Sequence, residues 1–197
     1  QQRLFERILE ADGITPEMIK AQQDRLNLIQ RLAMASAEAL PTSITQEDAL
    51  VDEQTFLILN RLIEASAAVG DEKSTQHLAG LQQALLEHST FGQQIAQQNR
   101  DTQKAITDLQ ALSQKGLTHE GLLELVINAS DSEVQLMTIV SMARGGMDYA
   151  FFQLLSDRLE NSKDGEQEKL IALREKLLEM THEVDEAIKE QALEAQK

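Results

Sequence analysis

The sequence predicts an all-α protein, a multi-helix bundle built from two related helical units. Three observations lead to this prediction. The 197 residues include only two prolines and nine glycines, and Ala, Leu, Gln, Glu and Lys, which lose little rotamer freedom in a helix, are abundant. Apolar residues recur three and four positions apart along most of the chain, which is typical of amphipathic helices. Two long stretches of the chain also resemble each other.

The resemblance between the two stretches indicates a duplicated helical unit. Residues 13–19 and 116–122 each contain a glycine that can end a helix and a threonine that can begin the next one. The stretch from Phe56 to Glu87 then matches the stretch from Phe152 to Glu179 in the order of its leucines, acidic residues and glycine. Duplication would place Thr15 on Thr118. Chance similarity between capped helices is the alternative.

The repeat divides the chain into three segments. We expect a first helical unit over residues 1–89, a connecting helix over 90–115 and a second helical unit over 116–197, which ends in a long helix. The connecting helix is rich in glutamine, and its apolar seam is interrupted by polar residues in the middle. We therefore expect it to be partly solvated.

The first unit should contain a short helix followed by three longer ones. The short helix carries Leu4, Phe5, Ile8 and Leu9 and ends at Gly13. The next helix begins with Thr15 as N-cap and Pro16 in the first position, where proline loses no hydrogen bond. Its inner stripe should consist of Ile19, Leu26, Ile29 and Leu32.

Further boundaries in the first unit follow from proline, capping residues and glycine. Pro41 should end the second helix near Leu40. A capping box at residues 45–48 should begin a third helix that continues to Gly70. Leucines from Leu78 to Leu86 mark a fourth helix.

In the second unit, polar and glycine residues separate four helices. Thr118 should cap the first helix, residues 130–132 should break the chain and cap the second, and Arg144-Gly145-Gly146 should break it again. Asp164-Gly165 should form the last turn. We expect the core of the two units to contain Phe56, Leu59, Ile63, Leu123, Val126, Ile139, Phe152 and Leu155.

The terminal helix carries the candidate interaction surface. Its apolar seam runs for two heptads and then fades toward Lys197. A helix from Glu166 to the end would be about 45 to 50 Å long at 1.5 Å per residue, longer than a small bundle needs. We expect its first half to pack within the chain and the remainder to fray or to meet a partner, including a second copy. The seam residues are Leu170, Leu173, Leu177, Met180, Val184 and Ala187.

Arg144 and Tyr149 are further interaction candidates, because the glycine pair and the only tyrosine of the chain lie together. The residue pattern favours a tight turn between helices with Tyr149 capping the core. A phosphate-binding loop is less favoured, since that site needs a preceding strand and a Gly-Lys-Ser/Thr element.

The sequence offers no complete catalytic or metal site, so we predict no catalytic residue, metal or cofactor. Glu179 and His182 have the spacing of carboxylate-bridged metal sites, but those sites need a second such pair. His77, His88 and His119 lie apart from one another, without a recognisable nucleophile context. Triads assemble in three dimensions, so an enzyme with a site between the two halves stays open.

The charge of the chain disfavours two classes of partner. The net charge of −15 repels phosphate backbones and anionic lipid headgroups. No apolar run approaches the roughly 20 residues of a membrane-spanning helix, and no signal segment opens the chain. The absence of cysteine excludes disulfides and cysteine-ligated zinc within these residues. We expect a soluble, cytoplasmic protein that binds a protein partner or itself, and a fragment of a longer chain, because the sequence begins without methionine.

Three segments resemble a known family: residues 8–19, 148–155 and 170–178 look like the helical C-terminal region of bacterial CpXC proteins. That family is named for paired Cys-Pro-x-Cys motifs in an N-terminal segment similar to a zinc ribbon. Those cysteines are absent here, so the resemblance implies that they lie upstream of Gln1 and transfers no metal ligand. The leading hypothesis is a non-enzymatic interaction or scaffold module. The alternatives are a helical enzyme or ligand-binding bundle, or the regulatory tail of a zinc-ribbon domain.

Overall fold

The chain is entirely helical in the part that the structure describes. A computed structural model describes residues 13–196, which form nine α-helices and two short 3-10 helices and contain no strand. The predicted all-α class is therefore confirmed. The expected short helix carrying Leu4, Phe5, Ile8 and Leu9 lies outside the described residues. Two compact units divide the chain, unit 1 at Gln1–Gln97 and unit 2 at Gln98–Lys197.

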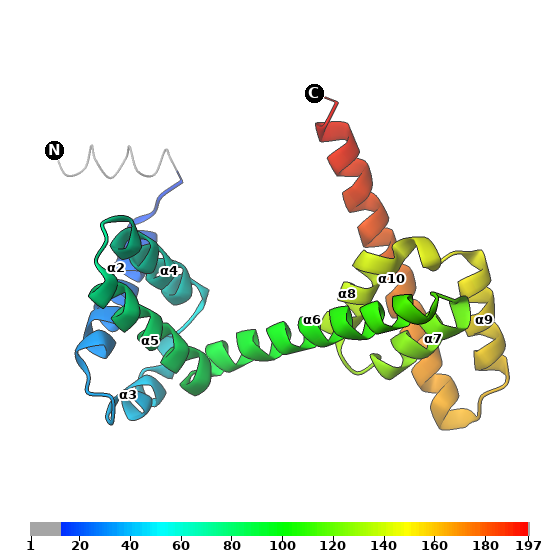
Figure 1. The fold of residues 1–197 in the computed structure, drawn as a ribbon, viewed down its shortest axis with the longest axis horizontal. Coiled ribbons are helices and arrows are strands. Elements are labelled where there is room, and N and C mark those ends of the chain that lie inside the picture. The colour runs from blue at the N-terminus through cyan, green and yellow to red at the C-terminus, as the bar shows by residue number, and fades with distance from the viewer. Residues whose placement is uncertain (1–12, 197) are drawn as a thin grey trace. The chain divides into compact units, whose positions relative to one another are not determined.

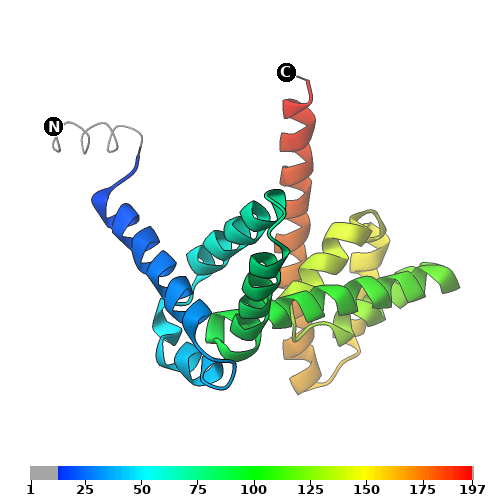
Figure 2. The same cartoon turned by 60° about the vertical axis from the view of Figure 1, so that its left-hand side comes forward.

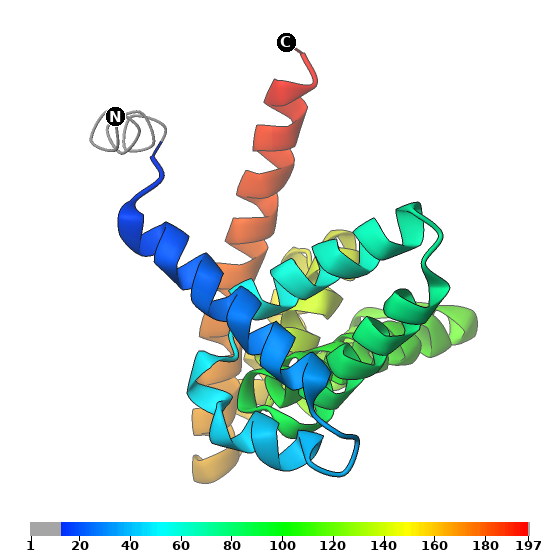
Figure 3. The ribbon, with the colours of Figure 1, turned by 90° about the vertical axis from the view of Figure 1, so that its left-hand side faces the viewer.

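Unit 1 is built around a helical hairpin. Its α4 and α5 run side by side, α2 packs on both of them, and α3 packs on α5 (Figure 3). The buried core lies between these helices and includes Leu28, Leu32, Leu59 and Leu85. The elements are α2 (Pro16–Met34), α3 (Leu40–Gln46), η1 (Asp48–Leu50), α4 (Glu53–Ala68), α5 (Glu72–His88) and the first turns of α6 (Thr90–Lys115).

Two predicted boundaries in unit 1 are wrong. The helix α2 ends at Met34, and Pro41 lies in the first turn of α3, where a missing N–H breaks no hydrogen bond. Residues 45–48 do not cap α4 but end α3 and begin η1. The inner stripe of α2 is also shorter than expected, because Ile19 is 44% exposed while Leu28 is fully buried.

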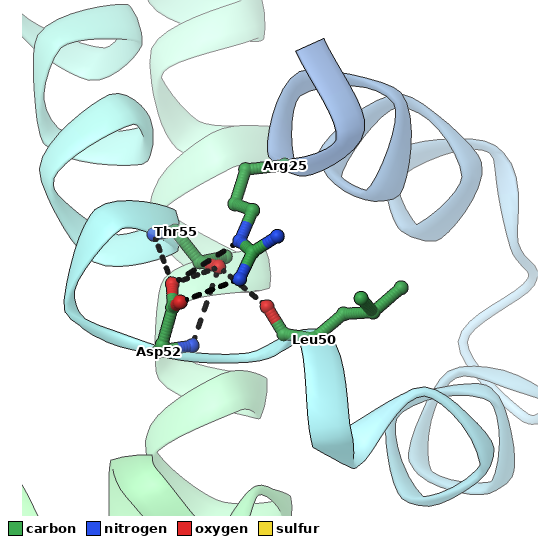
Figure 4. A network of polar contacts seen from close by, with 4 residues as sticks. All are labelled: Arg25, Leu50, Asp52 and Thr55. Carbon is green, nitrogen blue, oxygen red and sulfur yellow. Dashed lines mark hydrogen bonds and ion pairs between the residues drawn. The ribbon is translucent and has the colours of Figure 1, made fainter. Parts of the chain in front are cut away.

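The N-cap of α4 is Asp52, which lies at the centre of a network of polar contacts (Figure 4). Its Oδ1 accepts a hydrogen bond from the Thr55 backbone N–H at 3.2 Å, and the Thr55 Oγ1 accepts one from the Asp52 N–H at 3.3 Å. The Arg25 Nη2 on α2 donates to Asp52 Oδ2 at 2.7 Å. The Arg25 hydrogen bond is the main reason that the pKa of Asp52 lies below its ordinary value. This network joins α2 to the start of α4.

Unit 2 contains four α-helices after the end of α6, and its last helix is the longest of the described chain (Figures 1 and 2). Here α7 packs on α9, and both α8 and α9 pack on α10. The later turns of α6 add Ala105 and Leu109 to the core. The elements are α7 (His119–Asn128), α8 (Glu133–Ala143), η2 (Arg144–Gly146), α9 (Tyr149–Glu160) and α10 (Asp164–Glu194).

The predicted N-caps of three helices are confirmed. The side chains of Thr15, Thr118 and Ser132 accept hydrogen bonds from backbone N–H groups three residues further along, at 3.2, 3.0 and 3.2 Å. Gly116 precedes the second of these helices with φ +96°, a conformation in which a side chain would be strained. The expected turn at Asp164-Gly165 is wrong, because both residues belong to the first turn of α10.

The core prediction is confirmed at six of eight positions, and Ile63 and Phe152 are only partly buried. In α9 the fully buried ring is that of Phe151, which contacts Phe152 edge to face with ring centroids 5.3 Å apart. Each residue turns a helix by about 100°, so Phe151 shares the core face with buried Leu155 and Phe152 points beside it.

The two units have matching element orders and matching helix pairs. Apart from α6, the described part of each unit contains two helices, a 3-10 helix and two further helices, and in each the first helix packs on the third, the second on the fourth and the third on the fourth. The expected register, Thr15 on Thr118, sets the exposed Ile19 of α2 on the fully buried Leu122 of α7.

Candidate functional site

The candidate site is α10, the longest helix of the chain. The seam on its first half is part of the unit 2 core: Leu170, Leu173, Leu177 and Met180 are buried. Burial then decreases, because Val184 is half-buried and Ala187 is exposed. The first four seam residues therefore serve folding and do not lie on the surface.

The last turns of α10 extend past the helices on which its first half packs (Figure 1). Every residue from 186 to 196 is exposed. Two large apolar side chains lie in this segment, Ile188 at 55% and Leu193 at 63% exposure. Two more lie on the solvent side of the packed half, Ile171 at 44% and Leu178 at 47%. Four large apolar groups of one helix are therefore available to a partner.

Charged side chains accompany these apolar groups. The Lys189 Nζ donates a hydrogen bond to Glu186 Oε1 at 2.7 Å, and this contact is the main reason that the pKa of Glu186 lies below its ordinary value. Glu179 and His182 are both exposed on α10. Within residues 13–196, no group of three or more His, Cys, Asp or Glu side chains is arranged to hold a metal ion.

Arg144 is engaged inside unit 2. Its Nε and Nη2 donate to the two carboxylate oxygens of Asp185 on α10, each at 2.8 Å, and its Nη1 donates to the Met147 carbonyl at 2.8 Å. The Arg144 hydrogen bonds are the first cause of the lowered pKa of Asp185. This contact fixes η2 against α10 at Asp185, the last residue before the fully exposed segment 186–196.

Tyr149 does not cap the core, so that expectation is wrong. The side chain is 83% exposed and touches Gln153 through its hydroxyl at 3.4 Å. The reason is its position: Tyr149 is the first residue of α9, directly after the N-cap Asp148, and the core face of the helix begins two residues later at Phe151.

A groove in unit 1 is a site that the sequence did not indicate. It has a volume of about 690 Å³ and lies between α2, α4 and α5. Its apolar lining comes from Leu26, Ile29, Ala33, Leu62 and Leu78, and its polar lining from Gln30, Ser66, Lys73, Ser74 and His77. The His77 Nε2–H donates to the Ala33 carbonyl at 2.8 Å. The groove could accommodate an apolar group, with the Lys73 ammonium beside it for an anion.

A smaller groove of about 310 Å³ lies at the start of α7 in unit 2. His119 lines this groove, and its Nε2 lies 2.9 Å from Oδ1 of Asp148, which is not a lining residue; sequence reasoning missed this pairing of base and carboxylate. The pKa of Asp148 is lowered first by the Phe151 backbone N–H and then by His119. The only hydroxyl in the lining belongs to Thr118, whose Oγ1 accepts the cap hydrogen bond from Gly121. The lining therefore contributes His119 beside a carboxylate and one hydroxyl, and that hydroxyl is engaged in the cap of α7.

Comparisons with family models, with curated proteins and with solved structures find no match for this chain. Among residues 13–196, none of the helices combines the length and the apolar character that crossing a membrane requires.

Proposed function

We propose that this chain is a non-enzymatic protein-interaction or scaffold module made of two related helical units, with α10 as its recognition surface. The observation that supports the proposal is the exposed end of α10, residues 186–196, which carries Ile188 and Leu193. Membership of the family that the sequence resembles is part of this proposal, because the CpXC region is also helical.

The exposed end is well suited to recognition because it is already helical. An isolated helix shorter than about 12 residues is marginal in water, since its first turn is costly to form. Here the buried half of α10 supplies that turn, and the Arg144–Asp185 contact holds the helix just before it becomes fully exposed. A partner therefore meets a preformed helix, and binding does not have to order it.

The apolar groups on this helix favour use as an interface. Exposed apolar groups gathered on one face, with charged residues beside them, are typical of interaction sites, and Ile171, Leu178 and Leu193 share one face of α10. A fully buried leucine or isoleucine side chain contributes about 2 kcal/mol of hydrophobic free energy. Because these side chains are already about half covered, a partner that buries the rest of one of them gains about 1 kcal/mol. The three such groups on one face of α10 could contribute about 3 kcal/mol before the cost of association.

The two units also support the scaffold part of the proposal. Their matching element orders and matching helix pairs are what a duplicated unit would have. A duplicated chain can present different surfaces on one framework. Unit 1 has the open groove beside Leu62, whereas in unit 2 Arg158 on α9 pairs with Glu124 on α7.

Photocrosslinking in the cells that produce the protein tests this function. A photoreactive phenylalanine is placed at Leu193, and in a separate variant at Val69, which is 80% exposed and lies in unit 1. We expect a discrete adduct from position 193 and none from position 69. The partner is then purified and titrated against the chain, and Leu193→Glu should weaken binding about tenfold. Equal adducts at both positions, or no adduct from a folded protein, would contradict the proposal.

A further inference from the structure

We propose that α10 binds α10 of a second copy of the chain in antiparallel orientation, with the two-fold axis beside His182. This inference rests on the proposed function, because it names the partner of the same helix. Its basis is the face of α10 opposite the buried seam. That face is formed by residues three and four positions apart: Ile171, Glu175, Leu178, His182, Glu186, Lys189 and Leu193, all of them exposed.

The antiparallel register brings complementary groups together. With the axis at His182, Ile171 lies opposite Leu193 of the second copy, and Glu175 lies opposite Lys189. Leu178 lies opposite Glu186, whose carboxylate is paired with Lys189 of its own helix. Two-fold symmetry repeats each pair, so the interface contains two apolar pairs, two pairs of opposite charge and two contacts between Leu178 and Glu186.

The alternative orientation lacks this complementarity. In a parallel pair in register, each charged residue lies opposite its own copy, so Glu175 faces Glu175 and Lys189 faces Lys189. Like charges placed opposite each other on paired helices are destabilising. The charge pattern of α10 therefore selects the antiparallel pair.

The proposal also provides a cover for the exposed end of α10. The segment after Asp185 would lie along the solvent side of the partner's packed half, between Ile171 and Leu178. The contact from residue 171 to residue 193 spans about 33 Å at 1.5 Å per residue. The net charge of −15 on each chain opposes association, but at physiological salt charges separated by more than about 8 Å are screened while contact pairs persist.

Engineered cysteines test the register, because the natural chain has none. The full chain carrying His182→Cys is oxidised mildly at 0.15 M salt and at a concentration of about 100 μM. Each cysteine then lies at the axis, and a disulfide-linked dimer should form. In the Lys189→Cys variant the two cysteines are 14 residues apart along the paired helices, about 21 Å, beyond the roughly 7 Å between Cα atoms that a disulfide permits. We expect no homodimer from this variant, but a heterodimer when it is mixed with Glu175→Cys.

A charge exchange provides a second measurement, made by analytical ultracentrifugation. Lys189→Glu should weaken the dimer at least tenfold, and adding Glu175→Lys to the same chain should restore it. Lys115→Glu, on α6, changes the net charge equally and is the matched control. Failure of the second substitution to restore association would contradict the pairing.

The outcomes separate this inference from the proposed function. If Lys189→Cys without a second variant formed as much disulfide-linked dimer as His182→Cys, the antiparallel register would be wrong. A monomer at all concentrations with no crosslink at 182 would overturn the dimer. If position 193 still captured a different protein, the interaction function would stand and only the identity of the partner would be wrong.

Discussion

Replacing Asp52 measures how much its carboxylate stabilises unit 1 as the N-cap of α4 and how much as the partner of Arg25. The Asp52 side chain caps α4 through the Thr55 backbone N–H and also accepts hydrogen bonds from Arg25 of α2. Asp52→Asn keeps the cap, since asparagine is as good an N-cap as aspartate, but removes the charge. Asp52→Ala removes both. Comparing the two variants therefore separates the local contribution from the tertiary one.

The expected magnitudes follow from the exposure of the pair. An N-cap contributes about 1 kcal/mol. The side chains of Arg25 and Asp52 are 18% and 40% exposed, so solvent screens their attraction and we assign the ion pair about 0.5 to 1 kcal/mol. Asp52→Asn should therefore destabilise unit 1 by about 0.5 to 1 kcal/mol, and Asp52→Ala by about 2 kcal/mol.

Hydrogen exchange followed by mass spectrometry is the appropriate assay, because it reads each unit separately. Asp52→Ala should increase the exchange rate of protected amides in α2 and α4 about 30-fold, since 1.4 kcal/mol corresponds to a factor of ten. Peptides from α7 and α9 should keep their rates and act as the internal control. Asp148→Ala, which removes the N-cap of α9, should give the reverse pattern.

The pH dependence has a definite sign. The pKa of Asp52 in the folded protein lies below its ordinary value, chiefly because of the Arg25 hydrogen bond. The charge therefore contributes stability above the unfolded pKa of about 3.9, and that stability is lost as the pH falls through the folded pKa. The difference in unfolding free energy between the natural chain and Asp52→Asn should have its full value at pH 7 and should disappear once the pH is below the folded pKa of Asp52. Equal losses for Asn and Ala at pH 7 would refute the separate contribution of the cap.

Two further predictions concern packing. Phe151→Ala should destabilise unit 2 by about 3 to 5 kcal/mol, and Phe152→Ala by clearly less, because only the ring of Phe151 is fully buried. Denaturant unfolding followed by circular dichroism measures both losses of stability. Equal losses would contradict the difference in burial. Gly92→Ala should cost roughly 3 kcal/mol, since its Cβ would lie 2.1 Å from the Leu85 carbonyl oxygen. The matched control Gly80→Ala has open space in α5 and should stabilise the protein by about 0.5 to 1 kcal/mol. A Gly92→Ala variant as stable as the control would show that residue 92 does not lie this close to the Leu85 carbonyl oxygen.

The sequence predicted correctly those features that depend on neighbouring residues. The helix expected over 90–115 is α6, Thr90–Lys115, and Thr118 caps α7 as expected. A cap, a glycine stop and a run of strong helix formers act within one or two turns, so their effect can be read from a short window. The seam of α10 was predicted for the same reason, but its buried part ends at Met180, before the predicted members Val184 and Ala187.

Errors arose where several local choices have nearly equal energy. Pro41 is acceptable either after a helix or in its first turn, and the packing of α3 on α5 selects the second position. Phe151 and Phe152 are equally apolar, and only the orientation of α9 against α7 and α10 decides which ring enters the core.

The sequence by itself thus determined the fold class, most helix boundaries and the excess length of the terminal helix, because these depend on propensity and period. Only the tertiary structure decided which distant groups meet. Asp48 accepts a hydrogen bond from the Thr90 backbone N–H at 2.8 Å, and Arg144 pairs with Asp185. Each pair is separated by about forty residues, so no local pattern marks it. The grooves and the exposed face of α10 have the same origin, because exposure is decided by what the rest of the chain leaves uncovered.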